Sequence, residues 1–339
     1  MTKVLVTGGA GFIGSNYVRY ALREHRDWHV TTIDKLTYCG RMENLHDVLE
    51  HPRHRFVKAD IRDVPVSGPL VRESEIVVHF AAETHVDRSI QHADEFIQTD
   101  VLGTFALLEA ARDAKTLRRF VQISTDEVYG SVPTGASKET DELLPRNPYS
   151  ASKAGADRLA YSYWATYKVP VVITRASNNY GPYQFPEKVI PLFITNALED
   201  QAVPLYGDGL NVRDWLHVED HCRGIDAVIA RGGEGEVYNI GGGNEVPNIE
   251  LTKRILALVG KPETLIRPVA DRLSHDRRYA LDTAKLRTLG WEPRHDFEEG
   301  LAATVEWYTS NAWWWEPIKH KDAAYRDYYK KQYAERGPA

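Results

Sequence analysis

Short apolar runs alternate with amphipathic stretches along the first half of the chain. The apolar runs, which are rich in Val and Ile, predict buried strands at 3–6, 29–33, 56–63, 76–82, 120–123 and 169–175. Helical periodicity follows at 15–23, 100–112 and from about 147 to 164. Strands that alternate with helices in this way predict an α/β fold, namely a doubly wound parallel sheet of the Rossmann class.

The pattern changes to shorter elements after residue 176. Residues 178–183 have turn chemistry, 186–192 open a helix, 205–209 resemble a strand and turn, and 216–218 resemble a strand. No linker composition separates these elements from the sheet. We therefore expect a large domain at 1–176 with a return segment at about 217–240, and a smaller, interleaved α/β substrate-binding lobe at 177–216 and 241–339.

A glycine-rich turn joins the first predicted strand to the first predicted helix. Gly8, Gly11 and Gly14 are spaced as in dinucleotide-binding turns, with Phe12 and Ile13 between the last two. Such glycines allow a tight turn and a close backbone approach to a pyrophosphate, which the helix N-terminus then faces. The alternative is a glycine turn of the same shape that binds no cofactor.

Strand ends supply the remaining features of a dinucleotide site. Asp34 ends the second strand about 20 residues after the glycines, where a carboxylate accepts hydrogen bonds from the adenosine ribose and favours NAD. Lys35 and Arg41 leave NADP as an alternative, and a turn-capping role is an alternative for Asp34 itself. Further along the chain, Asp60 and Ile61 are placed to bracket an adenine, and the small residues Ala81 and Ala82 to let a cofactor pass the backbone.

Proton-transfer groups follow the strand at 120–123. Thr125, Asp126 and Glu127 lie where this strand ends, the edge at which parallel sheets bind ligands. Tyr149 and Lys153 are spaced to share one helix face, which suits removal of a hydroxyl proton while hydride leaves the same carbon. An ionised Glu127 beside a protonated Asp126 adds the groups that eliminating water requires. The structural alternative is an acid pair that caps a helix or meets arginines.

Composition excludes several classes of protein. The formal charge of −6 and the absence of a concentrated basic face argue against nucleic acid as the main partner. No apolar run approaches the ~20 residues of a membrane span, and no signal peptide is evident. Two isolated cysteines, Cys39 and Cys222, predict free thiols and no metal site. We therefore expect a cytoplasmic enzyme without metal or membrane association.

Basic residues in the second half of this acidic chain offer a second anion site. Arg213, Arg272 and His275 are candidates to clamp a pyrophosphate that belongs to the substrate. A solvated charged loop is the alternative interpretation.

Together these motifs resemble the extended short-chain dehydrogenase/reductases, and within them the nucleotide-sugar 4,6-dehydratases. The resemblance rests on residues 7–14, 34–38, 81–89, 124–130, 149–153 and 178–184, and extends through 204–209, Arg213, 271–276 and the Trp-rich tail. The Thr125-Asp126-Glu127 triplet discriminates, because related epimerases and decarboxylases share the Tyr-x-x-x-Lys helix but lack the acid pair. Epimerase and catalytically silent binding protein are the alternative functions.

The resemblance implies dTDP-glucose as the substrate, NAD as a tightly bound cofactor, and a homodimer formed through the helix that carries Tyr149. It implies a 4-keto-6-deoxy sugar nucleotide as the product. It assigns catalysis to Thr125, Asp126, Glu127, Tyr149 and Lys153. It places NAD against Gly8, Gly11, Phe12, Ile13, Gly14, Asp34, Lys35, Leu36, Thr37, Asp60, Ile61, Ala81, Ala82, Thr99, Tyr149, Lys153 and Asn179. The substrate site comprises Thr84, Thr125, Asn178, Glu187, Lys188, Val189, Pro204, Tyr206, Arg213, Asn248, Arg272 and His275.

Four positions depart from the usual residues of the family. Thr84 replaces Ser, Asp100 replaces Asn, Cys39 replaces Ala and Ser274 replaces Gly. None of these changes removes a catalytic group. The loss of a glycine at 274 is expected to alter how the basic loop approaches the diphosphate.

Overall fold

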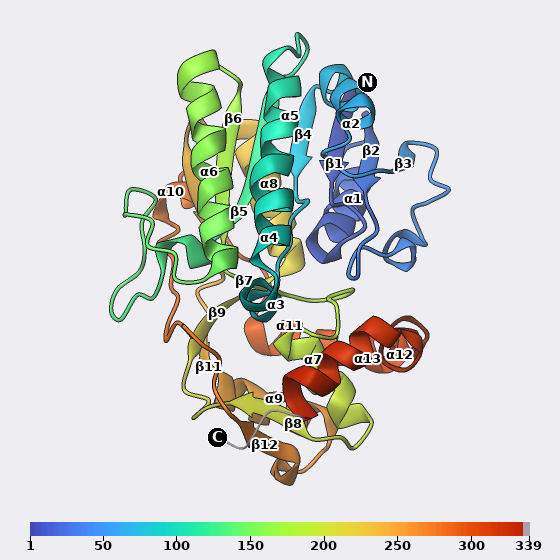
Figure 1. Ribbon diagram of the computed structural model, residues 1–339, viewed down its shortest axis with the longest axis vertical. Coiled ribbons are helices and arrows are strands. Elements are labelled where there is room, and N and C mark those ends of the chain that lie inside the picture. Colours follow the sequence, from blue (N-terminus) through green and yellow to red (C-terminus); the bar gives the residue numbers. More distant parts are fainter. Residues whose placement is uncertain (335–339) are drawn as a thin grey trace.

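A seven-stranded parallel sheet forms the centre of the larger lobe in the computed structural model, which describes residues 1–334 (Figure 1). The strand order is β10-β6-β5-β4-β1-β2-β3. The strands are β1 (Thr2–Thr7), β2 (Trp28–Asp34), β3 (His54–Lys58), β4 (Ile76–His79), β5 (Arg119–Thr125), β6 (Val171–Ala176) and β10 (Val237–Ile240). The order reverses between β1 and β4, which opens a crevice at the carboxyl ends of these strands.

Helices cover both faces of this sheet because its strands are apolar on both sides. Val4 and Val6 of β1 pack with helices α1 (Phe12–Glu24) and α8 (Val218–Arg231), whereas Leu5 packs on the opposite face. That opposite face is covered by α2 (Val64–Glu73), α5 (Gly103–Arg112) and α6 (Pro148–Tyr167). The predicted doubly wound parallel sheet is confirmed.

Several shorter elements complete the larger lobe. They are η1 (Met42–Leu45), α3 (Val86–Gln91), α4 (Ala93–Phe96), the π-helix η2 (Ile97–Leu102), η3 (Asp126–Tyr129) and α10 (Ala284–Arg287). Two of them lie at the carboxyl end of the sheet: α3 follows β4 through a short loop, and η3 continues directly from β5.

The smaller lobe has two small sheets and its own apolar core. Its elements are β7 (Asn178–Tyr180), α7 (Val189–Leu198), β8 (Val203–Tyr206), β9 (Val212–His217), β11 (Glu245–Pro247), α9 (Asn248–Val259), η4 (Glu263–Leu265), β12 (Ile266–Val269), α11 (Phe297–Ser310), α12 (Ala312–Lys321), α13 (Ala323–Tyr329) and η5 (Lys330–Ala334). Strands β11, β9 and β7 form one sheet, and β12 pairs with β8 in the other. Figure 1 shows this lobe below the carboxyl ends of the large sheet.

Several element boundaries differ from the sequence-based expectation. Residues 178–180 form strand β7 because they pair with β9, although their composition is typical of turns. Strand β9 covers 212–217, and Val218, expected in a strand, begins helix α8. The predicted helix 100–112 starts as a π-helix, and α5 itself begins at Gly103.

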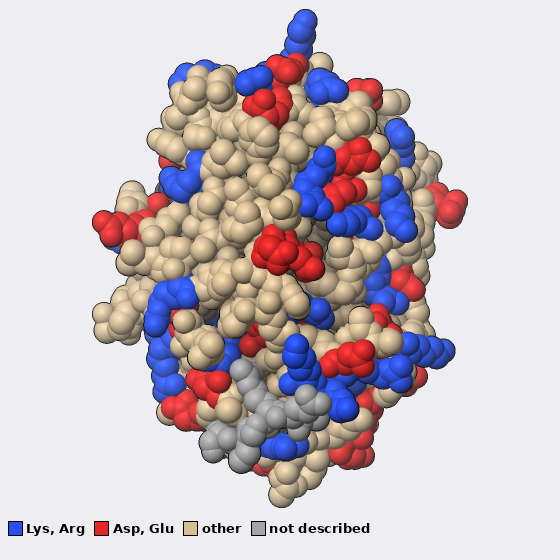
Figure 2. Space-filling view, viewed as in Figure 1, with Lys and Arg blue, Asp and Glu red and all other residues tan. Residues whose placement is uncertain are grey.

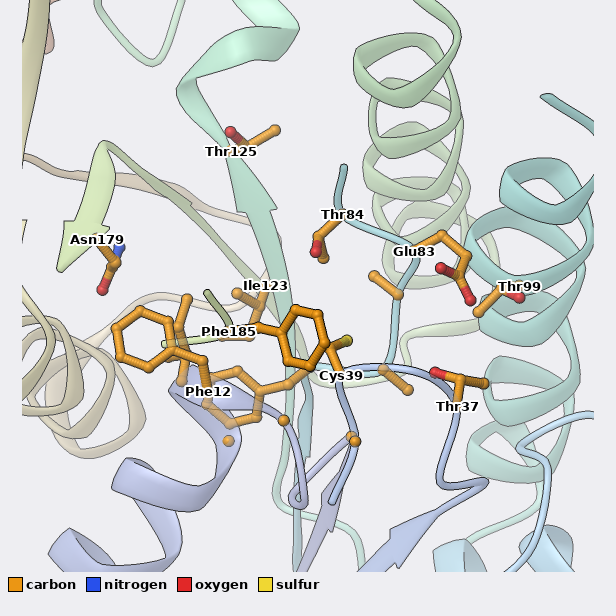
Figure 3. A pocket seen from close by; sticks show the side chains of 18 of the residues that line it. Phe12, Thr37, Cys39, Glu83, Thr84, Thr99, Ile123, Thr125, Asn179 and Phe185 are labelled. Atoms are coloured by element: carbon orange, nitrogen blue, oxygen red, sulfur yellow. The ribbon is translucent and has the colours of Figure 1, made fainter. Parts of the chain in front are cut away.

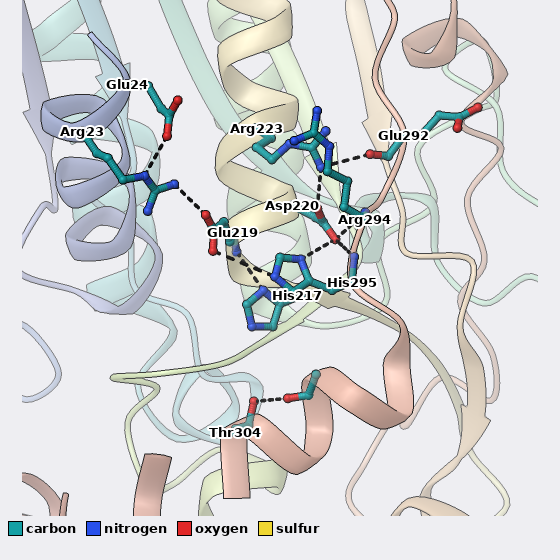
Figure 4. Close-up of polar contacts among 11 residues, drawn as sticks. Arg23, Glu24, His217, Glu219, Asp220, Arg223, Glu292, Arg294, His295 and Thr304 are labelled. Atoms are coloured by element: carbon teal, nitrogen blue, oxygen red, sulfur yellow. Dashed lines mark hydrogen bonds and ion pairs between the residues drawn. The ribbon is translucent and has the colours of Figure 1, made fainter. Parts of the chain in front are cut away.

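A polar network joins helix α8 to its neighbours (Figure 4). Glu219 of α8 accepts a hydrogen bond from Arg23 of α1 at 2.6 Å. Asp220 Oδ2 accepts from the backbone N–H groups of Arg294 and His295 at 3.0 and 2.9 Å. The segment leading into α11 is thereby fixed to the large lobe.

The C-terminal helices contact both lobes. Trp314 Nε1 of α12 donates to Asn44 Oδ1 at 2.8 Å, and Asn44 Nδ2 donates to the carbonyl oxygen of Ala10 in the glycine turn at 2.7 Å. At the far end of the same segment, Gln332 Nε2 donates to the Tyr206 hydroxyl oxygen at 2.7 Å. Residues 312–332 therefore connect the glycine turn to strand β8.

Candidate active site

The glycine turn leaves space for a ligand beside the first helix. Gly8 has φ 66°, and a Cβ added there would lie 2.6 Å from the backbone nitrogen of Ala81. Gly11 precedes α1 without a side-chain cap, so the first N–H groups of the helix have no side-chain partner of this kind. Uncapped N–H groups beside a glycine turn fit the negative charge of a pyrophosphate.

Asp34 holds the chain around this turn. Its Oδ2 accepts from the Ala10 backbone N–H at 2.9 Å, and its Oδ1 accepts from that of Leu36 at 2.8 Å. Leu36 has φ 60°, so Asp34 also caps a turn, which was the alternative role. Burial raises the pKa of Asp34, and the two backbone hydrogen bonds oppose this effect. Its neighbour Lys35 pairs with Asp60 at 3.0 Å.

One cavity brings together the predicted catalytic residues, all the predicted cofactor residues except Leu36, and fewer than half of the predicted substrate residues. The residues in its wall that were predicted from sequence are Gly8, Gly11, Phe12, Ile13, Gly14, Asp34, Lys35, Thr37, Asp60, Ile61, Ala81, Ala82, Thr84, Thr99, Thr125, Asp126, Glu127, Tyr149, Lys153, Asn178, Asn179, Glu187 and Lys188. Figure 3 shows Phe12 near the centre of this cavity, Thr37 and Thr99 on one side and Thr125 towards its far end.

Other predicted residues lie outside the wall of this cavity. Leu36 and Val189 pack partly against the two apolar cores. The remainder belong to the smaller lobe: Pro204, Tyr206, Arg213, Asn248, Arg272 and His275. The Tyr206 hydroxyl oxygen lies 3.4 Å from Asp87 Oδ2, and Arg272 Nη1 lies 4.0 Å from the same oxygen.

The basic side chains of the smaller lobe are buried near the acid pair. The Arg213 guanidinium lies 4.4 Å above the ring of Tyr279, whose hydroxyl is 3.5 Å from Glu127 Oε2. Burial and the charge of Arg272 lower the pKa of His275 to about 3, so this imidazole is neutral at neutral pH. Arg213, which lies on strand β9, is therefore buried close to the cavity at Glu127, whereas Arg272 and His275 of the basic loop are half-buried.

The two carboxyl groups at the end of β5 have different environments. The Asp126 side chain is buried, and its Oδ1 accepts from the Thr125 hydroxyl at 3.1 Å. Its Oδ2 is buried without a hydrogen-bond partner among the described residues. Burial, followed by the charge of Glu127, raises the pKa of Asp126 well above its usual value. The surroundings of Asp126 therefore favour its protonated form.

Helix α6 presents Tyr149 and Lys153 to the same cavity. The helix begins with a capping box, in which Asn147 Oδ1 accepts from the Ser150 backbone N–H at 2.9 Å, and with Pro148 in its first turn. Lys153 Nζ donates to the carbonyl oxygen of Ile123 in β5 at 2.7 Å. The cap and this contact fix the rotation of helix α6 about its axis, so that the side chains of Tyr149 and Lys153 both face the end of β5.

A neighbouring lysine is expected to lower the pKa of Tyr149, but the other surroundings of this phenol raise it. Burial raises it well above the usual value, and the charges of Glu127 and Asp100 add to this effect. A hydrogen bond with Thr125 acts in the opposite direction. The protein part of the site thus favours the neutral phenol, because burial and the charges of Glu127 and Asp100 outweigh the hydrogen bond with Thr125.

Comparison with known proteins places the chain in a family. The model of a family described as GDP-mannose 4,6-dehydratase matches residues 5–304. The chain belongs to this family.

Relatives of the family match nearly the whole chain. A dTDP-glucose 4,6-dehydratase of Streptomyces antibioticus is 53% identical over 327 residues, covering 95% of this chain and 96% of that protein. The low-salt glycan biosynthesis protein Agl12 of Haloferax volcanii is 55% identical over 305 residues, covering 90% and 98%. The crystal structure of the dTDP-glucose 4,6-dehydratase DesIV from Streptomyces venezuelae, with NAD bound, has a TM-score of 0.91, 52% identity and coverage of 94% and 100%.

The cavity contains residues that sequence reasoning missed. They are Ile33, Tyr38, Cys39, Gly40, Ala59, Phe80, Glu83, Ile123, Ser124, Ala176, Ser177, Gln184, Phe185 and His221. Glu83 could have been found, because it follows Ala81 and Ala82 at the end of β4. His221 could not, since it comes from the distant helix α8. Its Nδ1 lies 2.9 Å from Asn179 Oδ1, which also belongs to the cavity wall.

The four departures from the family pattern lie at or near the site. Thr84 and Cys39 line the cavity, and Asp100 is buried behind it. Ser274 has φ 51°, so the basic loop keeps the left-handed backbone that a glycine would adopt. A non-glycine residue in this conformation costs on the order of 1 kcal/mol.

Proposed function

We propose that this protein is a dTDP-glucose 4,6-dehydratase. The observation that carries the proposal is the convergence of Asp126, Glu127 and Tyr149 on one cavity that also contains the glycine turn. An epimerase needs only the tyrosine and lysine, whereas the elimination of water also needs an acid and a base that act on neighbouring carbons. The relatives with this name and with half of their residues identical support the same assignment.

NAD is the proposed cofactor, and the residues present fit it. The glycine turn and the first turn of α1 would hold the pyrophosphate, Asp34 the adenosine ribose and Lys153 the nicotinamide ribose. When bound, NAD supplies a reversible acceptor that takes hydride from the sugar C4 and returns it to C6. The Gly8 position supports this fit, because a side chain there would collide with the backbone of Ala81.

The side chains divide the proton transfers between them. Tyr149 accepts the proton of the sugar 4-hydroxyl in its phenolate form, which the positive charges of Lys153 and of the nicotinamide ring of bound NAD would favour. Thr125, which hydrogen-bonds Tyr149, orients that hydroxyl. Glu127 then takes the C5 proton, which the new C4 ketone acidifies. Asp126 donates its proton to the C6 hydroxyl, which leaves as water. Glu127 would return its proton to C5 when C6 receives hydride, which gives dTDP-4-keto-6-deoxy-glucose as the product.

The division of labour between the lobes follows the chain boundaries proposed from sequence. Residues 1–176 with 217–240 would bind NAD, and 177–216 with 241–339 would bind the nucleotide sugar, although Leu286 of α10 and Trp291, within the last of these ranges, pack in the core of the large lobe. Strand β10 supports the return segment, because it pairs with β6 in the large sheet. Arg213 and Arg272 would meet the substrate diphosphate, and Lys188, whose Nζ donates to the Thr84 carbonyl oxygen at 2.7 Å, would lie between the two ligands.

Purified protein is expected to convert dTDP-glucose to a product lighter by one water, without added NAD. The measurement is mass spectrometry of the product together with the absorbance of the base-labile 4-keto sugar. UDP-glucose, tested in parallel, separates the nucleotide preference from the chemistry. A product of unchanged mass but inverted C4 would identify an epimerase and overturn the proposal.

We also propose a cytoplasmic homodimer. Large apolar side chains are exposed on η2, α5 and α6: Ile97 at 47%, Leu102 at 44%, Phe105 at 45%, Tyr161 at 38% and Tyr167 at 49%. Figure 2 shows a surface over α5 and α6 that is largely free of charged residues. A second copy would bury this surface about a two-fold axis. The two free thiols, Cys39 and Cys222, suit a reducing compartment, and no helix among residues 1–334 is long and apolar enough to cross a membrane.

Replacing Phe105 by Glu is expected to shift the protein from dimer to monomer, because it would place a charge in the proposed apolar contact. Sedimentation equilibrium at several concentrations measures this shift. Leu258, which is 43% exposed on α9 in the other lobe, provides the control substitution Leu258→Glu. A monomeric wild-type protein, or an unchanged dimer in the Phe105 variant, would contradict this arrangement.

A further inference from the structure

Asp100 has an unusual position behind the catalytic helix. It is the one buried residue of the π-helix η2, which interrupts the helical path between α4 and α5. A π-helical turn widens the backbone locally and is often found at functional sites. Here it turns one carboxyl group inward, while the preceding residue, Thr99, lines the cavity.

The Asp100 carboxylate joins three segments that form the cavity wall. Its Oδ2 accepts from the Ser152 hydroxyl of α6 at 2.6 Å, and its Oδ1 accepts from the Glu83 backbone N–H at 2.8 Å. Ser152 directly precedes Lys153, and Glu83 directly precedes Thr84. One side chain therefore sets the spacing between the catalytic helix and the loop after β4.

The charge of Asp100 is the one available to balance Lys153. The lysine is 5% exposed, and the carboxylates of Asp100 and Asp157 act on its ammonium group. Asp157 is already paired with Arg175 at 2.8 Å and with Arg158 at 2.5 Å. Asp100 makes its hydrogen bonds to a hydroxyl and a backbone N–H, so its charge is not neutralised by a guanidinium.

We propose that Asp100 is a positioning residue for the proton acceptor Tyr149: its buried carboxylate fixes the catalytic helix and supplies the counter-charge of Lys153. This proposal rests on the proposed dehydratase function. An Asn at this position would provide the hydrogen bonds but not the charge.

The sign of the electrostatic effect follows from the charges around the site. Burial raises the pKa of Asp100 to about 6, so it is ionised at neutral pH. Its negative charge then raises the pKa of Tyr149 and opposes the lowering of that of Lys153. Other groups face the same region from neighbouring elements, namely Glu83, Arg88, Glu95, Asp126, Glu127, Asp157 and the neutral His79. All of these remain when only residue 100 is changed.

The substitution Asp100→Asn tests the charge with little change of shape. Its amide oxygen can accept from the Glu83 N–H, and its NH2 group can donate to the Ser152 oxygen. Removing the negative charge is expected to lower the pKa of Tyr149. In the plot of kcat against pH for dTDP-glucose, the acidic limb should therefore move to lower pH by about 0.5 to 1 unit. The KM should change by less than about two-fold.

Ser152→Ala is the matched control, because it removes the hydrogen bond from Ser152 to Asp100 and keeps the charge of Asp100. Its acidic limb should not move to lower pH, although its kcat should fall. If Asp100→Asn does not fold, Asp100→Ser removes the charge with less demand on donor geometry and is expected to shift the limb in the same direction.

The outcomes separate this proposal from the proposed function. An active wild-type enzyme whose acidic limb is unmoved in the folded residue-100 variant would overturn the positioning role of Asp100 alone. A downward shift of equal size in Ser152→Ala would also overturn it, since the effect would then not depend on the charge. A wild-type enzyme that does not dehydrate dTDP-glucose would overturn the function and this inference together.

Discussion

Glu127→Gln is expected to lower the rate of water elimination by about 10²- to 10⁴-fold, the usual contribution of a positioned general base. The amide cannot take the C5 proton, but it keeps the size of the carboxyl group and can still accept from the Tyr279 hydroxyl, which lies 3.5 Å from Glu127 Oε2. Tyr149 is untouched by the change. Oxidation at C4 should therefore proceed, and reduced nicotinamide should accumulate in place of product.

A single-turnover experiment measures both steps for this variant. Nicotinamide absorbance reports the first step, and mass spectrometry of the quenched mixture reports the loss of water. Glu250→Gln, at an exposed residue in the first turn of α9, is the control for the substitution itself. Sustained turnover in Glu127→Gln would refute the role of Glu127 as the base.

Tyr149→Phe is expected to have the opposite signature, with the first step slowed by about 10²- to 10⁴-fold. The phenyl ring fills the same buried space next to Phe96, so NAD and nucleotide binding should change by less than about two-fold. Without the hydroxyl, no group accepts the 4-hydroxyl proton, and no reduced nicotinamide should appear even though Glu127 is intact.

The nicotinamide absorbance in the single-turnover experiment distinguishes the two variants. Tyr161→Phe, which removes an exposed hydroxyl from the same helix, should behave as the wild type. If Tyr149→Phe instead accumulated reduced nicotinamide as Glu127→Gln does, Tyr149 would act after C4 oxidation and the assigned order of proton transfers would be wrong.

The central sheet could be predicted from sequence because its signal is local. Most of the buried strands contain a short run rich in Val and Ile, and several lead into a glycine turn or a carboxylate, as β2 does by ending at Asp34. The cavity residues near these strand ends were found for the same reason. The parallel arrangement then brings Asp34, Glu127 and their neighbours to one edge of the sheet.

The rest of the site depends on contacts between residues far apart in the sequence. Strand β7 has the composition of a turn and becomes a strand only by pairing with β9. His221 enters the cavity from a helix whose other side packs on the sheet. The high pKa of Tyr149 also escapes sequence reasoning, because it arises from burial and from Glu127, which is 22 positions away in the chain.

The contacts of the C-terminal helices have a consequence for how this protein tolerates change. Chain ends are usually the places where proteins accept deletions and fusions most readily. Here the Trp314 indole reaches the glycine turn through Asn44, and Gln332 reaches Tyr206 in the other lobe. The end of the chain thus acts as a spacer that sets the distance between the proposed cofactor and sugar sites. We therefore expect deletions within residues 312–332 to disturb the relative placement of the two proposed sites.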